Sequence, residues 1–320
     1  MRWLLGTNLQ QAAMYLEFFG LRELPFTLTP NIDFCIELDD HHHAYTQIKT
    51  ALAGGSALVA VTGEVGTGKS LICRCLMNSL NSSWLTAYIP NPFLTPDGLL
   101  LVLAGQLDIA ITADRGRQAL LDEITVALAN LKRDGRNAVL LLDEAQAMPD
   151  DSIDILRLLA NLEADSAKLL QIVMLGQPEL NDLLNRDALR QLKQRITLAV
   201  ELRSLSRTEL AVYIHQRLAK AGFPGSTLFS NKAMDDVFKA SGGNPRLINI
   251  LCHKAMLVAY GRGDTGVNHL HVARAVDDTV DARSDRKRDL GYSGGFRWPA
   301  MVAACACASG VTMLATWWLL

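Results

Sequence analysis

The sequence predicts an α/β protein in which a doubly wound, five-stranded parallel sheet is followed by a smaller helical domain. Three observations lead to this prediction. Short apolar segments alternate with helical segments as far as Ser204, a pattern typical of parallel sheets. A glycine-rich motif directly follows the first apolar segment, as in a strand–loop–helix unit. Beyond Ser204 the pattern is helical only.

The expected elements follow from their local patterns. The expected strands are residues 57–61, 85–89, 138–142, 169–175 and 196–200, which are short and apolar. The expected helices are residues 41–53, 71–77, 96–110, 116–134 and 152–164, and then 207–221, 232–240, 246–260 and 269–280. We therefore expect an α/β domain over residues 14–203 and a helical lid over residues 204–280. Met14 opens this regular stretch and is the expected natural start.

Composition indicates a globular chain and bears on three kinds of function: nucleic acid binding, zinc binding and dithiol redox chemistry. The 320 residues are 49% hydrophobic and 20% charged, with a net charge of −2. This balance offers no bulk electrostatic attraction to nucleic acid, although it leaves room for a local basic patch. The six cysteines contain no C-x-x-C pair, so neither a zinc site nor a thioredoxin-like dithiol is predicted.

Residues 63–70 read GEVGTGKS and match the phosphate-binding pattern G-x-x-x-x-G-K-[ST]. In such a loop, backbone N–H groups and the following helix N-terminus point at phosphate oxygens. We expect Lys69 to reach the β- and γ-phosphates of a nucleoside triphosphate and the Ser70 hydroxyl to ligate Mg²⁺. The expected nucleotide-binding residues are Gly63, Glu64, Val65, Gly66, Thr67, Gly68, Lys69, Ser70 and Leu71.

Two adjacent carboxylates follow the apolar segment at residues 138–142. Ligands of open α/β sheets bind at the carboxyl ends of the strands, where Asp143 and Glu144 are expected to lie. Asp143 would hold Mg²⁺ directly or through water, and Glu144 would orient and deprotonate an attacking water. The alternative is a buried strand that ends in a solvated turn.

Three further residues are weaker candidates for a role in hydrolysis. Gln177 follows the strand at 169–175 and would sense the γ-phosphate, or merely cap the strand. Arg195 precedes the last strand and is preferred to Arg190 as an arginine finger that acts in a neighbouring subunit. The alternative for both arginines is a solvated basic helix end. Arg246 begins a lid helix and would swing over the nucleotide, or remain a surface residue near a cap.

The N-terminal segments have two open interpretations. Residues 14–30 are aromatic and rich in turn formers, so they would either cover a nucleotide base or form a hydrophobic staple. The run His41-His42-His43 is expected to open the first helix with exposed imidazoles. Adjacent histidines on a helix point in different directions, so this run is not expected to bind metal.

The C-terminal tail predicts a membrane anchor. Residues 281–298 form a basic linker, and residues 299–320 contain no charged side chain. About 20 apolar residues suffice to span a bilayer, and the preceding basic cluster places the ATP-binding side in the cytoplasm. The alternative is a buried C-terminal helix.

Together these features resemble an AAA+ ATPase, and several segments resemble the ExeA/GspA group of that class. The segments are MYLEFFGLRELPFTLTP, TGEVGTGKS, TAYIPNPFLTP, LLLDEAQAMP, KLLQIVMLGQPEL and NPRLINILCHKA. The resemblance covers about residues 14–280. It implies that ATP binding and Mg²⁺-dependent hydrolysis depend on Lys69, Ser70, Asp143 and Glu144. It also implies sensor and arginine-finger roles for Gln177, Arg195 and Arg246. Relatives in this group continue into a periplasmic peptidoglycan-binding part, which is not transferred to this chain.

The resemblance also implies partners and a location. Members support assembly of type IV pili, including MSHA-like pili, and of type II secretion machinery at the bacterial inner membrane. A homo-oligomer is expected because a finger arginine needs a neighbouring subunit. Two other functions stay open: a DNA-associated ATPase like the transposition regulators, and a nucleotide-gated scaffold. The tail and the absence of a helix-turn-helix or basic arm favour the membrane function over nucleic acid binding.

Overall fold

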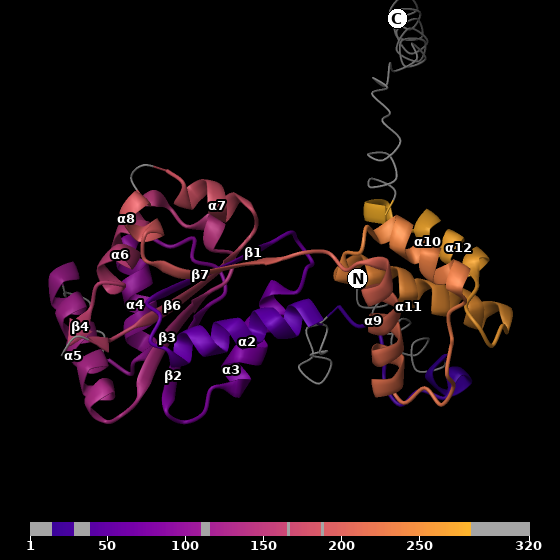
Figure 1. The fold of residues 1–320 in the computed structure, drawn as a ribbon, viewed down its shortest axis with the longest axis horizontal. Helices are drawn as coiled ribbons and strands as arrows, with labels where there is room; N and C mark the ends of the chain where they lie inside the picture. The colour runs from indigo at the N-terminus through magenta and orange to yellow at the C-terminus, as the bar shows by residue number, and fades with distance from the viewer. Residues whose placement is uncertain (1–14, 29–38, 110–115, 165–166, 187–188, 283–320) are drawn as a thin grey trace, which may run out of the picture. The chain divides into compact units, whose positions relative to one another are not determined.

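The computed structural model describes residues 15–28, 39–109, 116–164, 167–186 and 189–282. Within these residues, five parallel strands form one sheet in the order β2–β3–β6–β1–β7 (Figure 1). The strands are β1 (Leu58–Gly63), β2 (Trp84–Ile89), β3 (Asn137–Leu142), β6 (Gln171–Gly176) and β7 (Ile196–Leu202). The predicted five-stranded parallel sheet is therefore confirmed.

The two faces of the sheet are buried under different helices. Leu58 and Ala60 of β1 join one hydrophobic cluster, whereas Val59 and Val61 join another, because successive side chains of a strand point to opposite faces. The first cluster is completed by α4 (Pro96–Gln106), α5 (Arg117–Arg133), α6 (Asp150–Leu159), α7 (Glu179–Leu184) and α8 (Arg190–Lys193). The second is completed by α2 (Asp39–Ala53) and α3 (Lys69–Ser79). This is the expected doubly wound arrangement.

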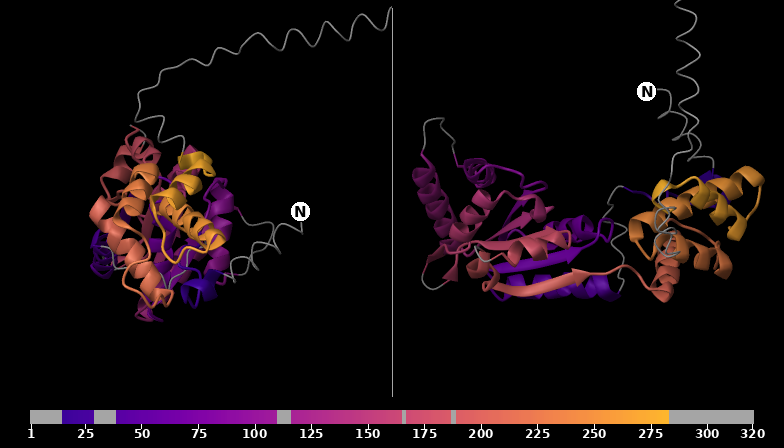
Figure 2. Two further views of the ribbon diagram at one scale, coloured as in Figure 1. Left: turned by 90° about the vertical axis from the view of Figure 1, so that its right-hand side faces the viewer. Right: turned by 90° about the horizontal axis from the view of Figure 1, so that it is seen from above.

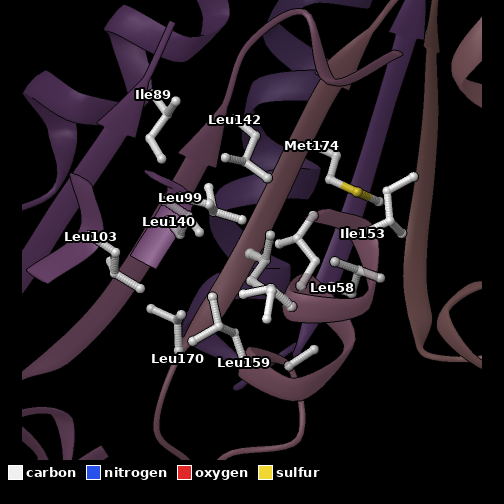
Figure 3. Close-up of a cluster of buried hydrophobic side chains, with 14 of the residues drawn as sticks. Leu58, Ile89, Leu99, Leu103, Leu140, Leu142, Ile153, Leu159, Leu170 and Met174 are labelled. Atoms are coloured by element: carbon white, nitrogen blue, oxygen red, sulfur yellow. The ribbon is translucent and has the colours of Figure 1, made fainter. Parts of the chain in front are cut away.

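Figure 3 shows the packing on the first face. Leu58, Leu140, Leu142 and Met174 of the strands lie beside Leu99 and Leu103 of α4 and Ile153 and Leu159 of α6. All of these side chains are buried. Full burial of one such side chain contributes about 1.5–3 kcal/mol relative to exposure, so the cluster holds the strand ends at fixed positions.

Two predicted helices of the α/β domain are shorter than expected, and the lid helix predicted at 269–280 ends at Asp277. The helix predicted at 152–164 ends at Leu159, and Glu163–Ala164 (β4) pairs with Ala167–Lys168 (β5) as a short antiparallel ribbon. Ala160 and Leu162 still pack against the core cluster beyond the helix end, so the chain leaves the helix without leaving the core. The helix predicted at 96–110 ends at Gln106. Asp108 adopts φ of 57°, a left-handed conformation that cannot continue a right-handed helix.

The lid consists, in the described residues, of α9 (Arg207–Lys220), α10 (Asn231–Ser241), α11 (Pro245–Arg262) and α12 (His269–Asp277). Figure 2 shows these helices, in orange to yellow, gathered around one another. Polar side chains cap their N-termini: Ser206 on α9, Ser230 on α10, Asn244 on α11 and Asn268 on α12. Each cap accepts a hydrogen bond from a backbone N–H of the first helical turn and so defines where the helix begins.

The aromatic N-terminal segment packs into the core of the lid. Tyr15, Phe19 and Phe26 are buried in the same cluster as the residues of α9 to α12. The Phe26 and Phe229 rings meet edge to face with centroids 6.0 Å apart. The N-terminal segment is therefore part of the hydrophobic core of the lid.

Within the described ranges, no helix combines the length and the apolar character that a bilayer crossing requires. The predicted membrane helix at 299–320 and nearly all of the predicted linker lie outside these ranges, as does Met14. The domain bounds and the anchor therefore stay predictions.

Gly243, which links α10 to α11, should be essential for the stability of the lid. Its φ is +79°, and an added Cβ would lie 2.0 Å from the Leu205 carbonyl oxygen. We expect Gly243→Ala to lower the free energy of unfolding by at least about 2 kcal/mol. Gly261→Ala is the matched control, because an added Cβ there meets no described atom within 4 Å. It should raise the stability by about 0.5–1 kcal/mol. Equal urea midpoints for the two variants would contradict this account.

Candidate nucleotide-binding site

The glycine motif forms a tight loop between the central strand β1 and helix α3. Gly66 and Gly68 have φ of 86° and 99°, which other residues rarely adopt. Gly63 is needed for space, since a Cβ there would lie 2.7 Å from the Leu202 carbonyl oxygen and 2.8 Å from Thr67 Oγ1. The strand–loop–helix geometry that the motif predicts is therefore present. Its glycines are required for two reasons: positive φ at Gly66 and Gly68, and lack of space for a side chain at Gly63.

Lys69 turns back over the loop that precedes it. Its Nζ donates to the carbonyl oxygens of Gly63 at 2.6 Å and Glu64 at 2.9 Å. Only 5% of the residue is exposed. Burial lowers the pKa of the Lys69 ammonium below its usual range, although the carboxylates of Glu144 and Asp143 partly offset this effect. A concentrated positive charge therefore lies inside the phosphate-binding loop.

Ser70 and Asp143 come from distant parts of the sequence and meet at the sheet edge. Ser70 Oγ donates to Asp143 Oδ2 at 2.6 Å, and the hydroxyl of Tyr88 lies 3.5 Å from the same oxygen. Asp143 is buried. Hydroxyl and carboxylate oxygens are hard ligands, and Mg²⁺ takes one or two of these from a protein while phosphates and water complete its shell. The pair therefore fits Mg²⁺, while no denser group of metal-ligating residues occurs among the described residues.

Glu144 lies beside Asp143 and is held by two amide side chains. Its Oε2 accepts from Gln146 Nε2 at 2.6 Å and from Gln177 Nε2 at 3.2 Å. Burial alone would raise the pKa of Glu144, but these two hydrogen bonds and the charge of Lys69 outweigh it, so the pKa is lowered. The carboxylate is therefore ionised near neutral pH and able to accept a proton.

Gln177 thus contacts Glu144, whereas Arg195 lies elsewhere. Arg195 Nη1 donates to the Ala160 carbonyl oxygen at 3.4 Å, beyond the end of α6. Ile196 pairs with Leu58, so Arg195 lies beside the start of β1 and the glycine loop lies beyond its end. Arg195 therefore lies near the opposite end of β1 from the glycine loop of its own chain, and Arg190 is exposed on α8.

Helix α11 of the lid begins against the tip of the glycine loop. The Arg246 backbone N–H donates to the Gly66 carbonyl oxygen at 3.3 Å. Asn244, which the sequence reasoning did not single out, caps α11 through Oδ1 and donates from Nδ2 to the Val65 carbonyl oxygen at 2.6 Å. A Cβ on Gly66 would lie 2.6 Å from Asn244 Oδ1, so this approach also requires glycine.

A cavity of about 340 Å³ lies beside the glycine loop, Glu144 and the start of α11. Its lining includes Thr27, Leu28, Val65, Gly66, Gly68, Lys69, Ser70, Leu71, Glu144 and Arg246. Buried polar residues of the lid complete it: Arg217 Nη1 donates to the Tyr213 hydroxyl at 2.9 Å, which donates to Asn249 Oδ1 at 3.0 Å. Arg217 Nε also donates to the Pro25 carbonyl oxygen at 2.5 Å, which fixes the N-terminal segment beside the cavity. No sequence motif pointed to this group.

One histidine departs from the predicted exposure. His41 is half-buried, and its Nε2 lies 2.6 Å from the Thr67 carbonyl oxygen of the glycine loop. His42 and His43 are exposed, as expected. His41 therefore supports the loop from the start of α2, a contact that the run of three identical residues could not indicate.

Comparison with known proteins agrees with this geometry. An AAA domain model matches residues 53–184. Over this range the chain has the P-loop α/β fold of an AAA domain. The chain is 38% identical to general secretion pathway protein A of Aeromonas hydrophila over 307 residues, which is 95% of this chain and 54% of that protein. The chain thus spans about half the length of this curated relative.

Solved structures support the fold alone, because their sequence identity is low. Cdc6p from Pyrobaculum aerophilum superposes with a TM-score of 0.63 at 18% identity, covering 79% of this chain and 70% of that chain. Drosophila ORC, in a structure bound to DNA, gives a TM-score of 0.60 at 18% identity, covering 93% and 83%. These matches therefore support the fold.

Lys69→Ala should weaken nucleotide binding strongly. A hydrogen bond to a charged group contributes about 1.5–3 kcal/mol, so the loss of Lys69 should weaken binding of a fluorescent ATP analogue by roughly 10- to 100-fold. Lys132→Ala is the matched control, since Lys132 contacts Asn137 Oδ1 at 2.8 Å at the start of β3. Unchanged affinity in Lys69→Ala, measured by fluorescence titration, would remove the glycine loop from the binding site.

Proposed function

We propose that this chain is an ATPase that binds and hydrolyses ATP with Mg²⁺. The observation that carries the proposal is the convergence of Lys69, Ser70, Asp143 and Glu144, with the Ser70–Asp143 hydrogen bond of 2.6 Å joining the glycine loop to the strand end. Similarity to an AAA domain over residues 53–184 supports nucleotide binding. Each group has the chemistry that phosphoryl transfer to water requires.

The proposed roles follow from position. Lys69 and the loop backbone bind the β- and γ-phosphates, while Ser70 and Asp143 hold Mg²⁺. Bound Mg²⁺ supplies neutralisation of the charge that develops on the phosphate oxygens. Glu144 lines the cavity and is ionised near neutral pH, so it is available to accept a proton from the attacking water. Gln177 contacts this carboxylate and serves as the sensor.

Two arginines complete the proposed site from other directions. Arg246 stands at the start of α11 and lines the cavity, so a small movement of the lid would carry its guanidinium over the nucleotide. Arg195 acts in a neighbouring subunit of a homo-oligomer, because its place beside the start of β1 separates it from the loop of its own chain. Such a finger is typically worth ~10³–10⁵ in rate.

We further propose that the ATPase supports assembly of a type II secretion system or an MSHA-like type IV pilus. The similarity to general secretion pathway protein A supports a secretion role. The finer resemblance, to the MSHA pilus biogenesis protein MshM, rests on the segments quoted in the sequence analysis. The apolar stretch at 299–320 and the basic residues before it support single-pass anchoring in the bacterial inner membrane, with the ATPase domain in the cytoplasm.

ATP turnover by the 320-residue chain in detergent, with and without double-stranded DNA, tests this function. Salt is held constant because phosphate contacts depend on it. We expect Mg²⁺-dependent turnover that is absent in Lys69→Ala and insensitive to DNA. Strong stimulation by DNA would overturn the assembly function in favour of a DNA-associated ATPase. Absence of turnover in the wild type would favour a nucleotide-gated scaffold.

Glu144→Gln should separate binding from hydrolysis. The amide keeps the size of the side chain but cannot accept the water proton, so turnover should fall by roughly 10²- to 10⁴-fold while ATP still binds. Glu201→Gln, which changes an exposed carboxylate on β7, serves as the control. Single-turnover hydrolysis and a binding titration measure the two effects. Equal turnover in the wild type and Glu144→Gln would refute the assignment of the base.

A further inference from the structure

Gln146 joins the ends of two strands through both atoms of its amide. Its Oε1 accepts the backbone N–H of Gln177 at 3.0 Å, directly after β6. Its Nε2 donates to Glu144 Oε2 at 2.6 Å, directly after β3. An amide oxygen can only accept and an amide nitrogen can only donate, so the first contact determines which atom faces the carboxylate. Gln146 is therefore fixed in one orientation.

Glu144 needs such support because its own backbone is strained. Its φ of 55° and ψ of 39° place it in the left-handed region, which costs a residue with a side chain of order 1–3 kcal/mol. The 3-10 turn Ala145–Ala147 follows at once and carries Gln146 back toward the carboxylate. Gln146 and Gln177 both contact Oε2, so Oε1 is the oxygen that neither amide occupies.

Gly176 provides the space that this arrangement requires. A Cβ on Gly176 would lie 2.8 Å from Gln146 Oε1 and 2.9 Å from Leu180 Cδ2. Gly176 does not have a positive φ among the described backbone angles, so its small size rather than its flexibility matters here. The close approach of Gln146 to the end of β6 is thus built into the backbone.

We propose that Gln146 is a positioning residue for hydrolysis, which holds the Glu144 carboxylate so that Oε1 faces the attacking water. The proposal rests on the proposed ATPase function. Gln146 does not touch the nucleotide in this assignment, since the cavity is lined by Glu144 and not by Gln146. It acts by linking the base to the sensor strand, so that a displacement of Gln177 is transmitted to Glu144 through one rigid amide.

Gln146→Met tests the proposal in the 320-residue chain. Methionine has a similar length and volume but neither donates to Glu144 nor accepts from Gln177. We expect kcat for ATP to fall roughly 10- to 100-fold, as for a catalytic group displaced by about 1 Å, with KM and the affinity for an ATP analogue nearly unchanged. Gln118→Met is the matched control, because Gln118 is exposed on α5 and its amide contacts Asp122.

Two further variants separate positioning from general damage. Gln146→Glu keeps an acceptor for Gln177 but sets a second carboxylate against Glu144, so kcat should fall at least as far as in Gln146→Met. In a Glu144→Ala background, Gln146→Met should cause no further loss, because a residue that acts only through Glu144 has nothing left to position. Thermal unfolding of each variant monitors the fold.

The outcomes are distinguishable. Wild-type kcat in Gln146→Met, or a further loss in the Glu144→Ala background, would overturn the positioning role while leaving the ATPase function intact. A rise in KM and a loss of affinity that match the fall in kcat would also overturn it, since the residue would then serve nucleotide binding. Absence of turnover in the wild type would overturn the ATPase function and this inference together.

Discussion

The hydrogen bond between Ser70 and Asp143 is the contact on which the candidate site depends. It can form only if the helix after β1 and the end of β3 reach the same edge of the sheet. Parallel pairing secures this, because the carboxyl ends of β1 and β3 point the same way with β6 between them. The buried aliphatic residues on both faces hold this register, so the strength of the core determines the precision of the site.

A second constraint is the close approach of the lid to the glycine loop. Asn244 caps α11 and also contacts the Val65 carbonyl oxygen, which leaves no space for a side chain at Gly66. Arg217 meanwhile binds the Pro25 carbonyl oxygen and keeps the N-terminal segment on the lid. The cavity wall is therefore assembled from three separate stretches of chain, and movement of the lid would move two of them together.

The environment of Glu144 shows how strain and hydrogen bonding are balanced. A left-handed backbone at a non-glycine residue persists only where the surroundings determine it. Here the amides of Gln146 and Gln177 compensate by binding one carboxylate oxygen, and Lys69 adds a favourable charge. The arrangement makes a carboxylate that is ionised, oriented and still able to accept a proton.

The sequence by itself determined the sheet, the glycine loop and the two carboxylates at the end of β3. These features depend on local pattern: a run such as residues 138–142 must be buried, and the loop glycines satisfy local requirements of φ and space. Only the tertiary structure decided that α6 ends at Leu159, that Arg195 lies beside the start of β1, and that His41, Asn244 and Gln146 reach the site. The physical reason is that some of these contacts join residues far apart in the chain, whereas others depend on the orientation of one side chain. Neither kind of contact produces a periodic pattern in the sequence.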